Sequence, residues 1–146
     1  MPNADTHWRI IADEIRKFVD AHSSARLVDN FGTRDYLSMM SFARVMVGNS
    51  SSGLIEAPSF ELPVVNVGTR QRGRVRAENV IDVEYSREEI NRGIQKALDP
   101  AFRKRLRNLV NPCGTGDAAK KIVERLKTVV LTDESVLSKK FQDIIH

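Results

Sequence analysis

A hydroxyl-rich turn is the segment of this sequence best suited to chemistry. A short apolar run ends at Val47, and the turn that follows contains Ser50, Ser51, Ser52 and Gly53. The turn is followed by the apolar start of a helix. A strand, a turn of small residues and a helix N-terminus together present free backbone N–H groups and the positive end of a helix dipole. The three hydroxyl groups add further donors. The pattern therefore predicts that this turn binds a phosphate group.

Glu56 follows Ser52 by four residues, so one helical turn would place its carboxylate on the same face. There it could accept hydrogen bonds from the hydroxyls of a ribose. Gly53 stands where a capping box needs Ser or Thr, which favours a ligand role for Glu56. Leu54 replaces the lysine of a Walker A loop, which argues against a metal-dependent ATPase. We therefore predict a nucleoside diphosphate site; the alternative is that the serines only cap a helix.

Four arginines alternate with other residues after the next apolar run: Arg70, Arg72, Arg74 and Arg76. In an extended segment all four would point to one side, and such a row suits phosphate or carboxylate. The alternative is a solvated loop, or pairing with Glu78 and Asp82. Aromatic residues make up only 6% of the chain and none interleaves with the row, so we expect no nucleic acid partner.

Composition describes one globular domain of 146 residues, with 41% hydrophobic and 29% charged residues. No apolar run approaches the roughly 20 residues that span a membrane, and no signal peptide opens the chain, so we expect no membrane partner. The single cysteine, Cys113, cannot form an internal disulfide, which fits a reducing cytoplasm. The three histidines lack metal-ligand spacing, and we expect neither a metal nor a cofactor.

Strands alternate with helices along most of the chain. We expect strands at 45–47, 63–67 and 79–83, a further short one at 26–28, and helices at 7–21, 34–42, 53–60, 86–98, 100–110, 115–131 and 133–145. Asn3 or Asp5 could cap the first helix, and Ser86 with Glu89 forms a capping box. The alternation predicts an α/β fold with a doubly wound parallel sheet.

In such sheets the ligand lies at the carboxyl ends of the strands. The loops after Val47 and Val67 should therefore open onto the same edge, which would bring Ser50–Gly53 close to Gly68–Arg70. A parallel sheet normally opens with a strand, and no strand precedes the first helix signal. We therefore expect the chain to begin inside a larger fold.

Several longer motifs resemble the UDP-N-acetylglucosamine 2-epimerase family: GNSSSGLIEAPSF at 48–60, LPVVNVGTRQRGR at 62–74, AENVI at 77–81, PNAD at 2–5, YLSMMSFARVMVGNSSSG at 36–53 and NPCGTGDAAKKIVERL at 111–126. The segment GTRQRGR looks more like the hydrolysing branch, which feeds sialic acid synthesis. The resemblance covers nearly the whole chain.

The resemblance implies a fold and a set of site residues. Family members pair two Rossmann-like domains across a cleft, as in GT-B glycosyltransferases, and residues 1–146 would form the carboxy-terminal, UDP-binding domain, ending in a helix at 132–146. Ser50, Ser51, Ser52, Gly53 and Arg70 would bind the diphosphate. Glu56 would bind the ribose, and Phe31 falls where the family contacts the uracil. The first strand and the amino-terminal domain with the catalytic acids would be missing.

The resemblance also implies a reaction, in which UDP-N-acetylglucosamine and water give N-acetylmannosamine and UDP. This half would carry no catalytic residue and would be inactive alone. The missing domain would be supplied in cis or as a second chain, and the full enzyme would be a homo-oligomer. The alternatives are half of a split or related enzyme, such as a UDP-diacetylbacillosamine 2-epimerase or another GT-B nucleotide-sugar enzyme, a non-catalytic nucleotide-binding module, and a purely structural domain.

Overall fold

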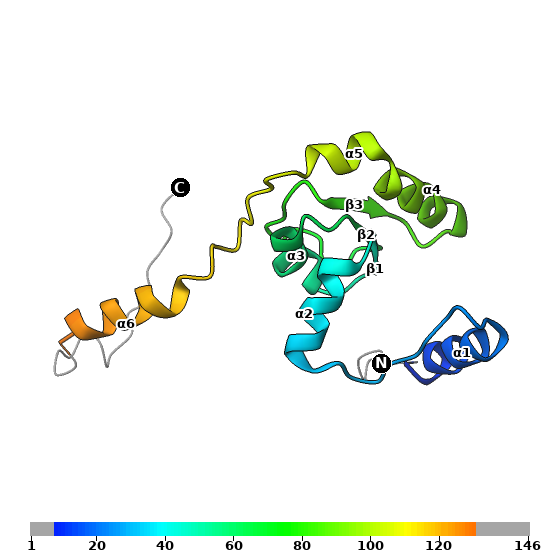
Figure 1. Cartoon of the computed structure of the whole chain (residues 1–146), viewed down its shortest axis with the longest axis horizontal. Helices are drawn as coiled ribbons and strands as arrows, with labels where there is room; N and C mark the ends of the chain where they lie inside the picture. The colour runs from blue at the N-terminus through cyan, green and yellow to red at the C-terminus, as the bar shows by residue number, and fades with distance from the viewer. Residues whose placement is uncertain (1–7, 131–146) are drawn as a thin grey trace.

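A small parallel sheet organises the computed structural model, which describes residues 8–130 (Figure 1). The elements follow the order α1 (Trp8–Ala21), α2 (Gly32–Phe42), β1 (Met46–Gly48), α3 (Ser52–Ile55), the 3₁₀ helix η1 (Ala57–Phe60), β2 (Val64–Val67), β3 (Val80–Val83), α4 (Arg87–Leu98), α5 (Pro100–Arg105) and α6 (Ala118–Thr128). The strands lie in the order β1-β2-β3, with Val47 opposite Val65 and Val65 opposite Ile81. All pairings are parallel, as the sequence predicted.

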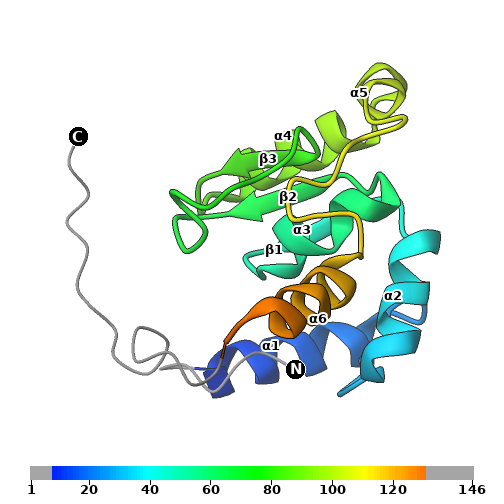
Figure 2. The ribbon, with the colours of Figure 1, turned by 90° about the vertical axis from the view of Figure 1, so that its left-hand side faces the viewer.

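Helices cover both faces of this sheet, because neighbouring strand residues point to opposite sides. Val65 packs in one cluster with Ala97 of α4 and Phe102 of α5. Val64 packs in the other cluster with Met40 of α2 and Ala57 of η1. Figure 2 shows the strands between α4 and α5 on one side and α2 and α3 on the other. The predicted doubly wound arrangement is confirmed.

Side-chain caps explain where the helices on one face begin and end. Ser86 Oγ accepts a hydrogen bond from the Glu89 N–H at 3.1 Å, so the predicted cap of α4 is confirmed. The Glu89 carboxylate contacts Arg92, so the reciprocal half of the box is not made. The helix predicted at 100–110 ends early, at Arg105. Asn108 adopts a left-handed φ of 62° and donates its N–H to Glu61 Oε1 at 2.7 Å, so a tertiary contact replaces the last helical turns.

Two further expectations need correction. The strand expected at 26–28 is wrong: the structure has no strand there, and Leu27 and Val28 are exposed, because no neighbouring strand pairs with this short segment. The helix expected at 115–131 is shorter, because Gly114 and Gly116 adopt positive φ values and delay its start to Ala118. The expected caps Asn3 and Asp5 and the helix expected at 133–145 lie outside the described residues.

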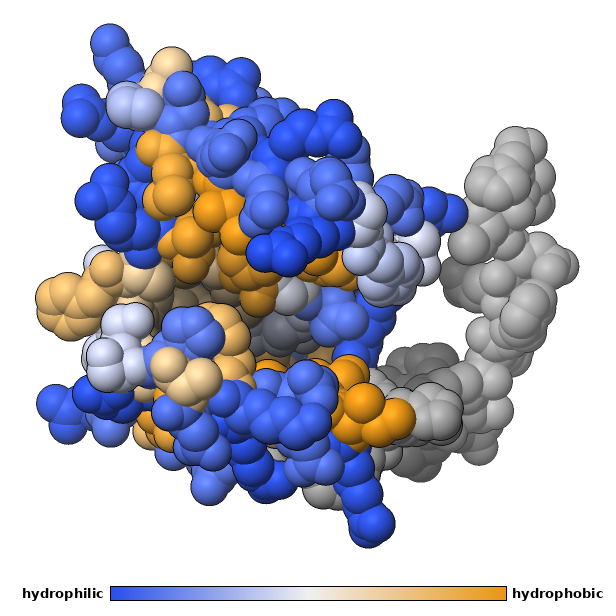
Figure 3. Space-filling view, turned by 90° about the vertical axis from the view of Figure 1, so that its right-hand side faces the viewer, coloured by the Kyte–Doolittle hydropathy of each residue, from blue (hydrophilic) through white to orange (hydrophobic). Residues whose placement is uncertain are grey.

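Two amphipathic helices, α1 and α6, project from opposite sides of the sheet-containing body (Figure 1). Large apolar side chains on both remain exposed: Ile10, Ile11, Ile15 and Phe18 on α1, and Ile122, Val123 and Leu126 on α6. Figure 3 shows apolar surface on both sides of a hollow between the part with α4 and the part with α1. Within residues 8–130, no helix is long and apolar enough to cross a membrane.

Candidate functional site

The serine turn connects β1 to α3 at the carboxyl end of β1. The Ser52 N–H donates to Ser50 Oγ at 3.3 Å, and the Glu56 N–H donates to the Ser52 carbonyl at 3.0 Å. Ser52 and Glu56 are therefore one helical turn apart, as predicted, although α3 is only four residues long. Gly53 is buried, and a Cβ atom there would lie 2.7 Å from Val64 Cγ1. Glycine at this position thus lets the turn pack directly against β2.

Gln71 joins the serine turn to the loop that follows β2. The residue is 2% exposed, and its Nε2 donates to the Asn49 carbonyl at 2.7 Å. Asn49 directly precedes Ser50, so this bond fixes one loop against the other. The prediction that the loops after β1 and β2 meet at one edge is confirmed.

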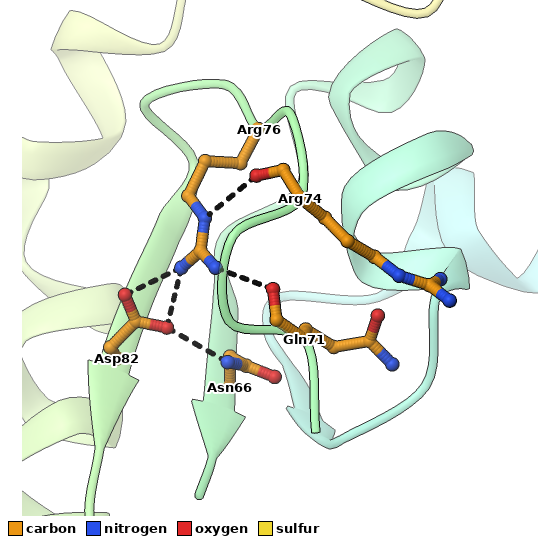
Figure 4. A network of polar contacts seen from close by, with 5 residues as sticks. All are labelled: Asn66, Gln71, Arg74, Arg76 and Asp82. Carbon is orange, nitrogen blue, oxygen red and sulfur yellow. Dashed lines mark hydrogen bonds and ion pairs between the residues drawn. The ribbon is translucent and has the colours of Figure 1, made fainter. Parts of the chain in front are cut away.

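Arg76 holds the loop after β2 in a folded shape (Figure 4). Its Nη1 contacts Asp82 Oδ1 at 2.7 Å and Oδ2 at 2.5 Å, and its Nη2 donates to the Gln71 carbonyl at 2.8 Å. Asn66 Nδ2 donates to the same Asp82 Oδ1 at 2.8 Å. Arg76 therefore forms an ion pair with Asp82 that holds the loop in place. This pairing was the alternative interpretation of the arginine row.

The extended arginine row predicted from the sequence is wrong. Residues 68–74 form consecutive turns, closed by bonds such as that from the Arg72 N–H to the Thr69 carbonyl at 3.0 Å. The four side chains therefore do not share one side. Arg72 lines a cavity of about 200 Å³ with Thr69 and Asn66. Arg70 is exposed in the same turn.

Glu56 lines a larger cavity, of about 490 Å³, between α2, α3–η1 and the segment Asn111–Lys121. Such a volume is in the range of small-molecule sites. Oε2 of Glu56 is buried and has no hydrogen-bond partner among the described residues. A buried oxygen of this kind is costly unless a donor reaches it. Glu56 therefore places a carboxylate at this cavity, and one of its oxygens lacks a hydrogen-bond donor among the described residues.

The far side of this cavity carries an ion pair at the start of α6. Lys121 Nζ lies 2.8 Å from Asp117 Oδ2, and Thr115 Oγ1 donates to Asp117 Oδ1 at 3.1 Å. The hydrogen bond from Lys121, and then that from Thr115, lowers the pKa of Asp117. Asp117 is therefore ionised through the neutral range, and its charge is matched locally.

Of the other residues considered in the sequence analysis, Cys113 lines the cavity beside Glu56 and Phe31 does not. Phe31 precedes α2, is 38% exposed and lines neither of the two cavities. Cys113 lines the larger cavity, with Sγ 3.9 Å from the Leu54 carbonyl. In residues 8–130, no group of three His, Cys, Asp or Glu side chains could hold a metal ion. Sequence reasoning missed Gln71 and Asn111, because their contacts join segments that lie far apart in the chain.

Comparison with known proteins identifies the family. The sequence profile described as UDP-N-acetylglucosamine 2-epimerase matches residues 1–127. The chain belongs to the UDP-N-acetylglucosamine 2-epimerase family. The expectation from the motifs is thus confirmed.

Two curated members of the family are each 38% identical to this chain. One is the UDP-N,N'-diacetylbacillosamine 2-epimerase (hydrolyzing) of Legionella pneumophila, matched over 89% of the chain and 33% of the relative. The other is the GDP/UDP-N,N'-diacetylbacillosamine 2-epimerase (hydrolyzing) of Campylobacter jejuni, matched over 97% and 36%. The chain therefore spans about a third of the length of these epimerases.

Crystal structures of UDP-N-acetylglucosamine 2-epimerases, which are GT-B enzymes, share the fold. The structure from Neisseria meningitidis, determined with UDP-GlcNAc bound, aligns with a TM-score of 0.66 and 23% identity over 86% of this chain and 35% of that chain. A provisionally named family member from Listeria monocytogenes aligns with a TM-score of 0.67 and 17% identity over 94% and 36%. The Rossmann-like fold predicted from the sequence is confirmed.

Proposed function

We propose that this chain is the UDP-binding half of a hydrolysing UDP-N-acetylglucosamine 2-epimerase. The observation that carries the proposal is Glu56, which lines a cavity of about 490 Å³ one helical turn from the serine turn and whose buried Oε2 has no hydrogen-bond partner among the described residues. A ribose has two adjacent hydroxyls that could donate to this carboxylate. The family membership supports the same ligand.

The diphosphate would lie at the carboxyl edge of β1 and β2. Ser50, Ser51, Ser52 and Gly53 would supply hydroxyl and backbone N–H donors, and Arg70 would supply a guanidinium from the adjoining loop. The bond between Gln71 and Asn49 supports this grouping, because it holds the two loops together. Phe31 remains the proposed uracil contact on the basis of the resemblance.

This half would act on the leaving group of the reaction. In the proposed hydrolysing reaction UDP leaves the sugar, and water then adds with inversion at C2 to give N-acetylmannosamine. Negative charge develops on the departing diphosphate, and prepositioned donors at the serine turn and at Arg70 would stabilise it. The groups that remove the proton at C2 would belong to the other half, so we expect this chain to be inactive alone.

That other half would be supplied on the same polypeptide or by a second chain, and the full enzyme would be a homo-oligomer. The exposed apolar faces of α1 and α6 support an additional partner surface, because contiguous apolar surface usually marks an interaction site. A second candidate substrate is UDP-N,N'-diacetylbacillosamine, which is favoured by the names of the two relatives that are 38% identical. The sugar would be contacted largely by the other half.

Calorimetric titration of the chain with UDP tests the proposal, with ATP as the control. We expect saturable binding of UDP and not of ATP. Glu56→Ala should weaken UDP binding, whereas Glu88→Ala, which changes an exposed glutamate on α4, should not. A folded chain that does not bind UDP would contradict the proposed function.

A further inference from the structure

The cavity beside Glu56 has a second wall, built from a part of the chain about 55 residues further on. Asn111, Cys113 and Gly114 line this wall, and Glu56 and Phe60 line the first. Figure 2 shows the segment that follows α5 running past α3 before it enters α6. The cavity therefore exists only because this later segment lies against the α3–η1 region.

Asn111 fastens the second wall to the first. Its Nδ2 donates to the Ile55 carbonyl at 2.8 Å and to Ser59 Oγ at 2.7 Å. Its Oδ1 accepts from the Cys113 N–H at 2.8 Å, which shapes the turn. These bonds use three of the four hydrogen-bonding positions of the amide. Ile55 and Ser59 flank Glu56 in the sequence, so the wall is anchored directly beside the carboxylate.

The wall presents backbone rather than side chains toward the cavity at two positions. Gly114 and Gly116 have φ values of 121° and 87°, and a Cβ atom at either would meet no atom of the described residues within 4 Å. Glycine is therefore required by the backbone conformation and not by crowding from the protein. The two glycines therefore leave this side of the cavity open to a ligand.

We propose that Asn111–Lys121 forms the second wall of the nucleoside site. The ribose hydroxyls would donate to Glu56, and Gly114–Gly116 would line the opposite side of the ribose. Cys113, the single cysteine of the chain, would lie at the edge of the bound nucleoside. This inference rests on the proposed function and adds to it the residues that close the site.

The reaction of Cys113 with a thiol reagent tests the inference, because this thiol is exposed and no other cysteine can react. With UDP at ten times its dissociation constant, we expect labelling to slow about tenfold, in proportion to the free fraction of the site. Pyrophosphate is the matched control: it can occupy the diphosphate subsite without entering the cavity, and should leave the labelling rate unchanged.

A variant of the anchor gives a second measurement. Asn111→Ala removes the bonds to Ile55 and Ser59, so we expect UDP affinity to fall about tenfold, with the fold retained by circular dichroism. Asn91→Ala, which changes an exposed asparagine on α4, should bind UDP like the original chain.

The proposed function and the second wall of the site can be contradicted by different results. If calorimetry shows UDP binding but neither the labelling rate nor the Asn111→Ala affinity changes, the second wall is wrong and the proposed function stands. If the original chain binds no UDP at all, both the proposed function and the second wall are wrong.

Discussion

The side-chain amide of Gln71 donates a hydrogen bond to the backbone carbonyl of Asn49 at 2.7 Å, across 22 residues of sequence. Gln71 is buried, whereas Asn49 is exposed at the start of the serine turn. Arg76 holds the Gln71 carbonyl from the other side, at 2.8 Å. The loop after β2 therefore supports the serine turn, which we propose binds the diphosphate.

Gln71→Leu should weaken UDP binding about tenfold and change stability by less than about 1 kcal/mol. Leucine removes this hydrogen bond, but it also removes Gln71 Oε1, which is buried without a partner among the described residues, and the carbonyl of the exposed residue Asn49 can bond to water instead. Calorimetry and urea unfolding measure the two effects separately. Gln95→Leu on the exposed side of α4 is the control. Unchanged UDP affinity in Gln71→Leu would show that this hydrogen bond does not matter to the site.

Glu56→Gln should lower the affinity for UDP without lowering the stability of the fold. The buried Oε2 has no hydrogen-bond donor among the described residues, so replacing the carboxylate by a neutral amide should leave stability unchanged or raise it by about 1 kcal/mol. UDP affinity should fall about tenfold or more, because an amide is a weaker acceptor for ribose hydroxyls than a carboxylate. Thermal unfolding with and without UDP measures both effects. Loss of stability without loss of affinity would make Glu56 a structural residue.

Local patterns were enough to predict most of this fold. The alternation of apolar strands with amphipathic helices predicted the parallel sheet, and the sheet in turn predicted that the loops after β1 and β2 meet. Ser86 was recognised as the cap of α4 because capping is a contact within three residues. These features depend on neighbours in the sequence, or on rules that hold for every parallel sheet.

The errors arose where contacts between distant residues decide the structure. The arginine row does not extend, because Arg76 bonds to both Asp82 and the Gln71 carbonyl and folds the loop back. The bonds of Gln71 to Asn49 and of Asn111 to Ile55 could not be predicted from the sequence, since the partners lie 22 and more than 50 residues away. The serine turn and Glu56 could be proposed from the sequence, but the cavity beside them could not.

The contribution of the Asp117–Lys121 ion pair to stability should depend on pH. The hydrogen bond from Lys121, followed by that from Thr115, lowers the pKa of Asp117 in the folded chain. The contribution to stability is therefore fully present above the unfolded pKa of about 3.9 and is lost as pH falls through the lower folded pKa. Lys121→Met should move the pKa of Asp117 back up, as an NMR titration of its carboxyl carbon would show. An unchanged titration would mean that the pair does not form in solution.

Two glycines of the loop after β2 allow the cost of a left-handed backbone and the cost of a steric clash to be measured separately. Gly68 and Gly73 have nearly the same left-handed backbone, with φ of 76° and 77°. Within the described part of the chain, a Cβ atom at Gly73 would meet no atom within 4 Å, whereas one at Gly68 would lie 2.1 Å from Tyr85 Cζ. Gly73→Ala should therefore cost only the backbone term of about 1 to 2 kcal/mol.

Gly68→Ala should cost about 3 kcal/mol or more, because the same backbone term is joined by a collision with an aromatic ring. Tyr85 is 67% exposed, so its ring can be removed without opening a cavity in the core. Tyr85→Ala combined with Gly68→Ala should bring the loss of stability down to that of Gly73→Ala, as measured by urea unfolding. Equal losses in the two single variants would show that the ring moves aside freely and that only the backbone conformation requires glycine at the end of β2.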